Sequence, residues 1–96
     1  MLSETYYIVR SKVDGKYLVA HINKGEDDAP VSYLLVFQEH FEALSYLNTH
    51  GSDVSDRFIV ESTSGTQLKG ILQRWSFQGI GLVKDPLLPR IEFLSS

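Results

Sequence analysis

The chain of 96 residues contains no cysteine, so it can form neither a disulfide framework nor a site that depends on a thiolate. No apolar run approaches the roughly 18–20 residues that a helix needs to cross a bilayer. The first residues, MLSETYY, lack the basic stretch and the apolar core of a secretory signal peptide. From these absences we expect a cytoplasmic protein that has no contact with a membrane.

The chain also has no excess of basic over acidic residues. Nine lysines and arginines stand against twelve acidic residues, which gives a formal net charge of −3. Nucleic-acid-binding proteins usually present a clustered basic face, because neutralising phosphates dominates their affinity. Here Lys69, Arg74, Lys84 and Arg90 lie singly along the second half of the chain. We therefore expect no nucleic-acid partner.

The length is that of one domain, and we expect residues 1–96 to form a single one. A chain of this size buries about 60–70% of the surface that its unfolded form exposes, so it can fold without a metal or a disulfide. A hydrophobic fraction of 43% and a charged fraction of 22% are ordinary for a globular protein. Most of the chain is therefore expected to be ordered.

Three strands are predicted in the first 37 residues. Residues 5–11 (TYYIVRS) and 16–22 (KYLVAHI) are rich in the Tyr, Val and Ile that suit a pleated surface. Between them, Asp14 and Gly15 accept the positive φ angles of a tight turn, so we expect an antiparallel hairpin. Residues 31–37 (VSYLLVF) are apolar almost throughout, which predicts a central strand covered on both faces.

Two helices are predicted further along. Residues 38–50 carry Phe41, Leu44 and Leu47 three apart, and Gly51 follows as a stop signal. The second helix begins with the capping-box spacing of Ser64 and Gln67, in which each side chain bonds a free backbone donor of the other residue. Its apolar stripe consists of Leu68, Ile71, Leu72 and Trp75. This spacing of i, i+3, i+4 and i+7 is typical of a helix face turned to a core.

Further strands are expected at residues 57–62 (RFIVES), 80–84 (IGLVK) and 90–94 (RIEFL), the last at an edge of the sheet. The order β-β-β-α-β-α-β-β predicts an α+β fold. We expect a mainly antiparallel sheet of five to six strands with two helices on one face.

The sheet face opposite the helices is expected to be apolar. Alternation along the second and third strands gives a candidate interaction surface of Tyr17, Val19, Tyr33 and Leu35. An aromatic ring on an open face forgoes roughly 1.5–3 kcal/mol that burial would give. We therefore expect a second copy of the chain to cover this surface, which predicts a homodimer. The alternative is that a few Tyr rings lie flat on the surface of a monomer.

No assembled catalytic or metal-binding motif is visible. If residues 38–50 are helical, His40 and His50 lie about 15 Å apart at 1.5 Å per residue, so they cannot share a metal within one chain. His21 stands apart on a strand, and the acidic residues 26–28 lack the alternating ligands of a calcium loop. The sequence also lacks a Gly-x-Ser-x-Gly elbow and a nucleotide-phosphate loop. We expect no cofactor, no metal and no catalytic residue.

A candidate pocket is predicted at Phe77 and Gly79, where the second helix leads into the next strand. Trp75 completes the apolar stripe of that helix, so we expect it to pack in the core. Phe77 lies beyond the stripe and can line a groove between helix and strand.

One segment resembles a known family. Residues 33–44 (YLLVFQEHFEAL) combine an apolar strand, Phe41 and a helix, and resemble a unit of the N-terminal domain of SseB-type proteins. Residues 79–86 (GIGLVKDP) are similar to that family's glycine, apolar strand and Asn-Pro turn, with Asp85 in place of the asparagine. The resemblance covers about half of the chain, without the opening hairpin or the tail. It implies an α+β domain without established catalytic residues and transfers no active site.

The leading hypothesis is thus a small non-enzymatic protein-interaction or regulatory module, homodimeric, with an unknown protein partner. The alternative is a small-molecule binding domain or minor enzyme with its pocket near Phe77 and Gly79. The sequence specifies neither the partner nor the order of the strands in the sheet.

Overall fold

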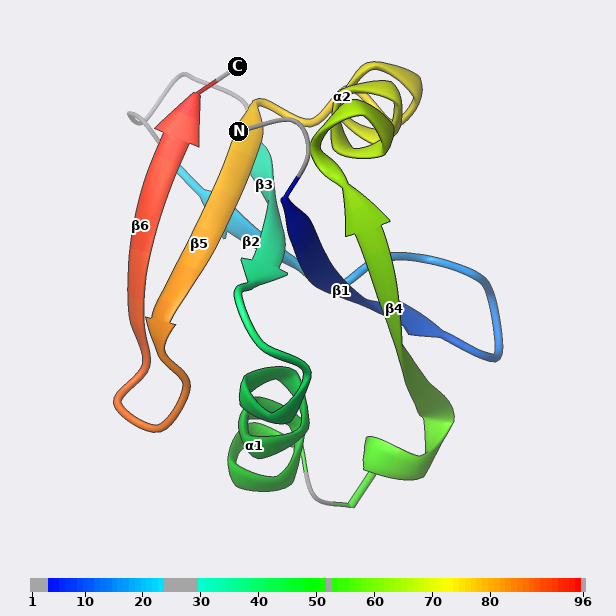
Figure 1. Cartoon of the computed structure of the whole chain (residues 1–96), viewed down its shortest axis with the longest axis vertical. Helices are drawn as coiled ribbons and strands as arrows, with labels where there is room; N and C mark the ends of the chain where they lie inside the picture. Colours follow the sequence, from blue (N-terminus) through cyan, green and yellow to red (C-terminus); the bar gives the residue numbers. More distant parts are fainter. Residues whose placement is uncertain (1–3, 24–29, 52, 96) are drawn as a thin grey trace.

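The computed structural model describes residues 4–23, 30–51 and 53–95. The order of strands and helices is the predicted one, and the fold class is α+β (Figure 1). The elements are β1 (Thr5–Ser11), β2 (Val19–Ile22), β3 (Val31–Phe37), α1 (His40–His50), the 3-10 turn η1 (Ser55–Arg57), β4 (Phe58–Ser64), α2 (Gly65–Arg74), β5 (Gly79–Asp85) and β6 (Arg90–Ser95).

One six-stranded sheet forms the centre of the molecule, with the order β4-β1-β3-β5-β6 and with β2 paired to β3 outside this path. Strands β3 and β5 are parallel, and the other neighbours are antiparallel. Residues 33–37 of β3 are buried throughout, which confirms a central strand covered on both faces. The edge position predicted for the last strand is also confirmed, because β6 ends the strand order.

The opening hairpin forms only at its turn. Gly15 has a positive φ of 73°, and the backbone N–H of Ser11 donates to the carbonyl of Lys16 at 2.8 Å. The second strand, however, begins at Val19 and pairs with β3, while β1 pairs along its whole length with β4. Leu18 marks the change of partner: its N–H donates to Val9 of β1, and its carbonyl accepts from Leu35 of β3.

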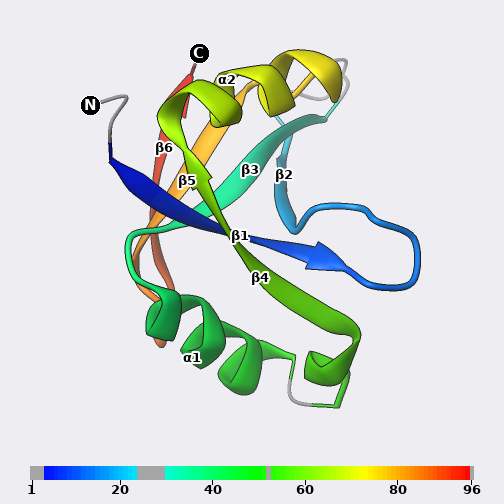
Figure 2. The same cartoon turned by 45° about the vertical axis from the view of Figure 1, so that its right-hand side comes forward.

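The two helices cover opposite faces of the sheet, so the prediction of both helices on one face is wrong. The apolar cluster beneath α2 contains Ile8, Leu34, Val36, Leu68, Leu72 and Leu82. The apolar cluster beneath α1 contains Val9, Leu35, Phe37, Ala43, Leu47 and Val83. Successive side chains of a strand point to opposite faces, so neighbouring residues of β3 contact different helices. Figures 1 and 2 show α2 and α1 at opposite ends of the views.

The apolar character of β3 explains this arrangement. A strand with apolar residues on both faces needs cover from both sides, and burying each Leu, Val or Phe side chain contributes about 1.5–3 kcal/mol. One helix on each face provides that cover within a single chain. The molecule therefore has three layers, with the sheet between the helices.

The helix ends follow the predicted signals. The N–H of Gly51 donates to the carbonyl of Leu47 at 2.8 Å and closes α1. The hydroxyl of Ser64 accepts from the N–H of Gln67 at 3.1 Å, and the Gln67 side chain accepts from the N–H of Ser64 at 3.0 Å. This capping box starts α2 as predicted. Neither helix in the described part of the chain is long and apolar enough to span a membrane.

Candidate functional site

Three aromatic rings meet on the α2 side of the sheet. Tyr17 precedes β2, Trp75 caps the C-terminus of α2, and Phe77 follows it. The rings of Tyr17 and Trp75 meet edge to face with centroids 5.4 Å apart, and Trp75 stacks on Phe77 at 6.1 Å. Such aromatic pairs contribute about 0.5–1.5 kcal/mol beyond the area they bury. Trp75 nevertheless remains 40% exposed.

These rings surround a hollow that we call the aromatic cleft. Its volume is about 240 Å³. Its lining consists of Lys16, Tyr17, Val19, His21, Ser32, Trp75 and Phe77. None of these residues is acidic, although the whole chain carries a net charge of −3.

The C-terminal turn of α2 places Trp75 and Phe77 side by side. Ser76 lies between them with a positive φ of 57°. Its N–H donates to the carbonyl of Gln73 at 3.3 Å, and the N–H of Phe77 donates to the carbonyl of Leu72 at 2.9 Å. These two bonds define a Schellman motif, which reverses the chain and brings Phe77 back against Leu72.

Tyr17 also lines a second hollow, which we call the α2 groove. It has a volume of about 350 Å³ between α2 and strands β1 and β4. It is lined by Ile8, Tyr17, Glu61, Ser62, Thr63, Gln67, Gly70, Ile71 and Arg74. The Arg10 guanidinium forms an ion pair with Glu61 and lies 5.8 Å from the centroid of the Tyr17 ring. Tyr17 thus contacts both Arg10 and Trp75 and lines both hollows.

Strand β2 borders the aromatic cleft and has an open edge. The bond from the Leu35 N–H to the Leu18 carbonyl sets the alternation of the antiparallel ladder. By this alternation Ala20 and Ile22 bond to β3, so the backbone N–H and C=O groups of Val19 and His21 point away from it. Among the described residues, no strand pairs with this edge. In Figure 2, β2 lies at the outer side of the sheet with the end of α2 above it.

The structure divides the predicted interaction surface between the two faces. Val19 lies opposite Leu34, so Tyr17 and Val19 lie on the α2 side. Leu35 is 2% exposed beneath α1, and Tyr33 is 5% exposed and packs against Phe93 of β6 at 5.0 Å. The four residues therefore do not form one exposed surface, because β2 lies on β3 with Val19 opposite Leu34, while Tyr33 and Leu35 point to the other face. The homodimer stays a prediction, and these four residues do not support it as one surface.

The two residues of the predicted pocket have different roles. Phe77 lines the aromatic cleft and also a hollow of about 510 Å³ with Lys69, Leu72, Gln73 and Ser76. Gly79 is buried where β5 meets β6, and a Cβ there would collide with the carbonyl oxygen of Leu94. Gly79 thus permits close packing of two strands, whereas Phe77 lines the two hollows described above.

The sequence predicts Trp75 as a core residue and not as a site residue, because Trp75 continues the apolar stripe of α2. The helix ends at Arg74, however, so the last stripe position projects beyond the covered surface. The position after the helix cap is Ser76 instead of the usual glycine or asparagine, so the sequence gives no stop signal there.

The histidines lie at separate places. His21 Nδ1 lies 2.9 Å from the Ser32 hydroxyl, His50 Nε2 lies 2.8 Å from the Pro86 carbonyl oxygen, and the His40 ring meets Tyr7 edge to face. In residues 4–23, 30–51 and 53–95, no group of three His, Asp or Glu side chains is placed to hold a metal ion. The predicted acidic run at residues 26–28 lies outside these ranges.

The pKa values of Tyr46 and Asp14 depart from their ordinary values, each for a structural reason. Burial raises the pKa of the phenol of Tyr46, a residue of α1 that packs against Phe37. The backbone N–H of Lys16 donates to the Asp14 carboxylate and lowers the pKa of this group. The first shift belongs to the core and the second to the turn before β2.

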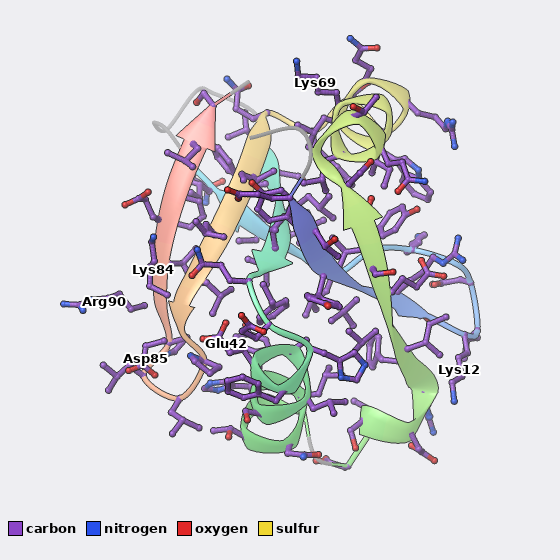
Figure 3. The ribbon with its side chains drawn as sticks, viewed as in Figure 1. Lys12, Glu42, Lys69, Lys84, Asp85 and Arg90 are labelled. Atoms are coloured by element: carbon purple, nitrogen blue, oxygen red, sulfur yellow. The ribbon has the colours of Figure 1, made fainter. Side chains whose placement is uncertain are left out.

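The labelled basic side chains in Figure 3 project from separate parts of the surface. Lys12 extends from the turn after β1, Lys69 from α2, and Lys84 and Arg90 from the β5-β6 hairpin. These residues are all exposed, and the fold does not gather the four of them on one face.

Comparison of the chain with protein-family models, with curated proteins and with solved structures finds no match. The resemblance to the SseB N-terminal domain type therefore stays a prediction. The geometry of the site is the basis for any functional proposal.

Proposed function

We propose that this chain is a non-enzymatic protein-interaction or regulatory module that binds its partner through the aromatic cleft. The observation that carries the proposal is the partly exposed Trp75, which forms a continuous aromatic wall with Tyr17 and Phe77. Trp and Tyr are enriched among the few residues that dominate binding energy at protein interfaces. Rings already held in place by their neighbours lose little side-chain entropy on binding.

The composition of the cleft supports recognition of a partner. The cleft joins an apolar aromatic wall to the cationic Lys16, which is the composition of a binding surface with an apolar centre and a polar rim.

Selection of a random twelve-residue peptide library on the native protein tests this proposal. We expect selected peptides to bind the native chain and to lose at least tenfold in affinity with Trp75→Ala. Phe41→Ala is the matched control, because Phe41 is an aromatic residue 65% exposed on α1, on the opposite side of the sheet. Peptides that bind Trp75→Ala as tightly as the native protein contradict the proposal.

The second candidate is a small-molecule binding domain. The hollow of about 510 Å³ beside Phe77 favours it, since ligand pockets usually measure about 300–1,000 Å³. Its lining joins the apolar Leu72 and Phe77 to polar Lys69, Gln73 and Ser76. A metabolite that raises the melting temperature of the native protein but not of Phe77→Ala would support this function.

A further inference from the structure

We infer that the partner segment is an extended peptide that adds as a strand to the open edge of β2, with an apolar side chain in the aromatic cleft and an acidic side chain near Lys16. This inference rests on the proposed function, because it names the kind of partner that the aromatic cleft takes. Strand addition is a common mode of peptide recognition, in which backbone bonds give affinity and pockets for alternate side chains give specificity.

The backbone of β2 offers hydrogen-bonding groups to an added strand. Val19 and His21 direct their N–H and C=O groups away from β3, and those groups match the repeat of an added strand. The edge is limited at one end, because the N–H of Leu18 is already bonded to Val9. An added strand therefore pairs with the residues Val19–Ile22 and cannot continue toward β1.

The hollows near β2 have room for side chains of an added strand. The side chains of Val19 and His21 line the aromatic cleft on the α2 side. Another hollow of about 210 Å³ lies on the α1 side, where Leu18, directly before β2, meets Tyr46, Leu47 and Phe58. Alternate side chains of an added strand point to opposite faces, so one side chain enters the aromatic cleft and the next points to the α1 side.

The charges around the aromatic cleft indicate the chemistry of the bound segment. Lys16 lines the aromatic cleft, Arg74 lines the adjoining α2 groove, and none of the described residues that line the cleft is acidic. Glu61, the acidic residue among the described residues that line the groove, is already paired with Arg10. This local cationic rim in a chain of net charge −3 favours an acidic side chain in the bound segment.

The test uses synthetic versions of the twelve-residue peptides selected on the native protein. We expect a saturating peptide to slow amide hydrogen exchange at Val19 and His21 at least tenfold, since these donors become bonded. N-methylation of alternate residues of the peptide removes the N–H donors along one of its edges. It should weaken binding at least tenfold when these donors face β2 and little when they face away from it. Lys16→Glu should weaken binding severalfold, whereas Lys12→Glu, an exposed change in the same turn, should not.

The outcomes separate this inference from the proposed function. In one outcome Trp75→Ala abolishes binding, neither set of N-methylations weakens it, and the exchange rates of the Val19 and His21 amides do not change. The aromatic cleft then binds the peptide, but strand addition is wrong. If binding does not depend on Trp75, the proposed function itself fails. Protection of Val19 and His21 that grows with protein concentration in the absence of peptide assigns the edge to a second copy and overturns the inference.

Discussion

At the scale of single residues, Ser76 adopts a backbone conformation that is costly for any residue with a Cβ. Its φ of 57° lies in the left-handed region, which costs about 1–2 kcal/mol for an L-residue other than glycine. The Schellman motif requires this conformation at the position after the helix cap. This conformation of Ser76 produces the chain reversal that brings Trp75 and Phe77 together at the aromatic cleft.

We predict that Ser76→Gly stabilises the protein by about 0.5–1 kcal/mol, because glycine adopts the left-handed conformation without steric cost. Urea unfolding followed by circular dichroism gives the free energy of unfolding. Ser62→Gly is the control, since Ser62 is an exposed residue inside strand β4, where glycine should cost about 0.5–1 kcal/mol. A Ser76→Gly variant less stable than the native protein contradicts this account of the turn.

At the scale of elements, two glycines that look alike in the sequence have opposite surroundings. Gly79 of β5 meets the backbone of β6, where its Cβ would lie 2.7 Å from the Cα of Ser95. Gly70 of α2 has open space, with no atom within 4 Å of an added Cβ. A methyl group is therefore excluded between the paired strands and accepted on the helix.

We predict that Gly79→Ala destabilises the protein by about 1–3 kcal/mol, because the methyl group forces β6 away from β5. Gly70→Ala should stabilise it by up to about 1 kcal/mol, because alanine is the better helix former. Urea unfolding measures both variants, and each serves as the control of the other. Equal effects of the two substitutions would show that the contact between β5 and β6 is looser than described.

The start of α2 depends on the reciprocal bonds of Ser64 and Gln67. Ser64→Ala should lower the free energy of unfolding by about 1 kcal/mol, because the N–H of Gln67 loses its acceptor. Thr66→Ala, an exposed change in the same turn that is not part of the capping box, should leave stability nearly unchanged. An unchanged stability of Ser64→Ala, or an equal loss in Thr66→Ala, where alanine is the better helix former, would contradict this role of the cap.

At the scale of the whole molecule, the helices cover both faces of the sheet and leave other apolar side chains exposed. Phe41 on α1 is 65% exposed, and Leu87 and Leu88 between β5 and β6 are 61% and 74% exposed. Apolar surface gathered in patches marks interaction sites more reliably than single exposed residues. A homodimer would have to use exposed apolar side chains such as these in place of the buried Tyr33 and Leu35.

The homodimer prediction is tested by light scattering over a concentration series. A homodimer gives the mass of two chains. Leu88→Asp should then shift the measured mass toward that of one chain, because the substitution places a charge in the interface. Tyr33→Asp should instead lower stability, since Tyr33 is buried within the chain. A mass of one chain at every concentration contradicts the homodimer.

The sequence predicts much of the fold because local signals agree with tertiary packing. The apolar run of residues 31–37, the capping box at Ser64 and the glycine after His50 each lead to the observed element. It predicts the site only in parts. Tyr17 and Val19 are indicated as an interaction surface and Phe77 as a pocket, and the structure brings all three to the aromatic cleft.

The sequence by itself determined the elements and their order, because periodicity, caps and turns act through residues that are close in the chain. Only the tertiary structure decided which face each helix covers and which strands pair. A shift of one residue in register reverses every side chain of a strand, and this register depends on contacts between distant segments. For that reason Val19 lies in the aromatic cleft while Tyr33, on the neighbouring strand, is buried on the other face.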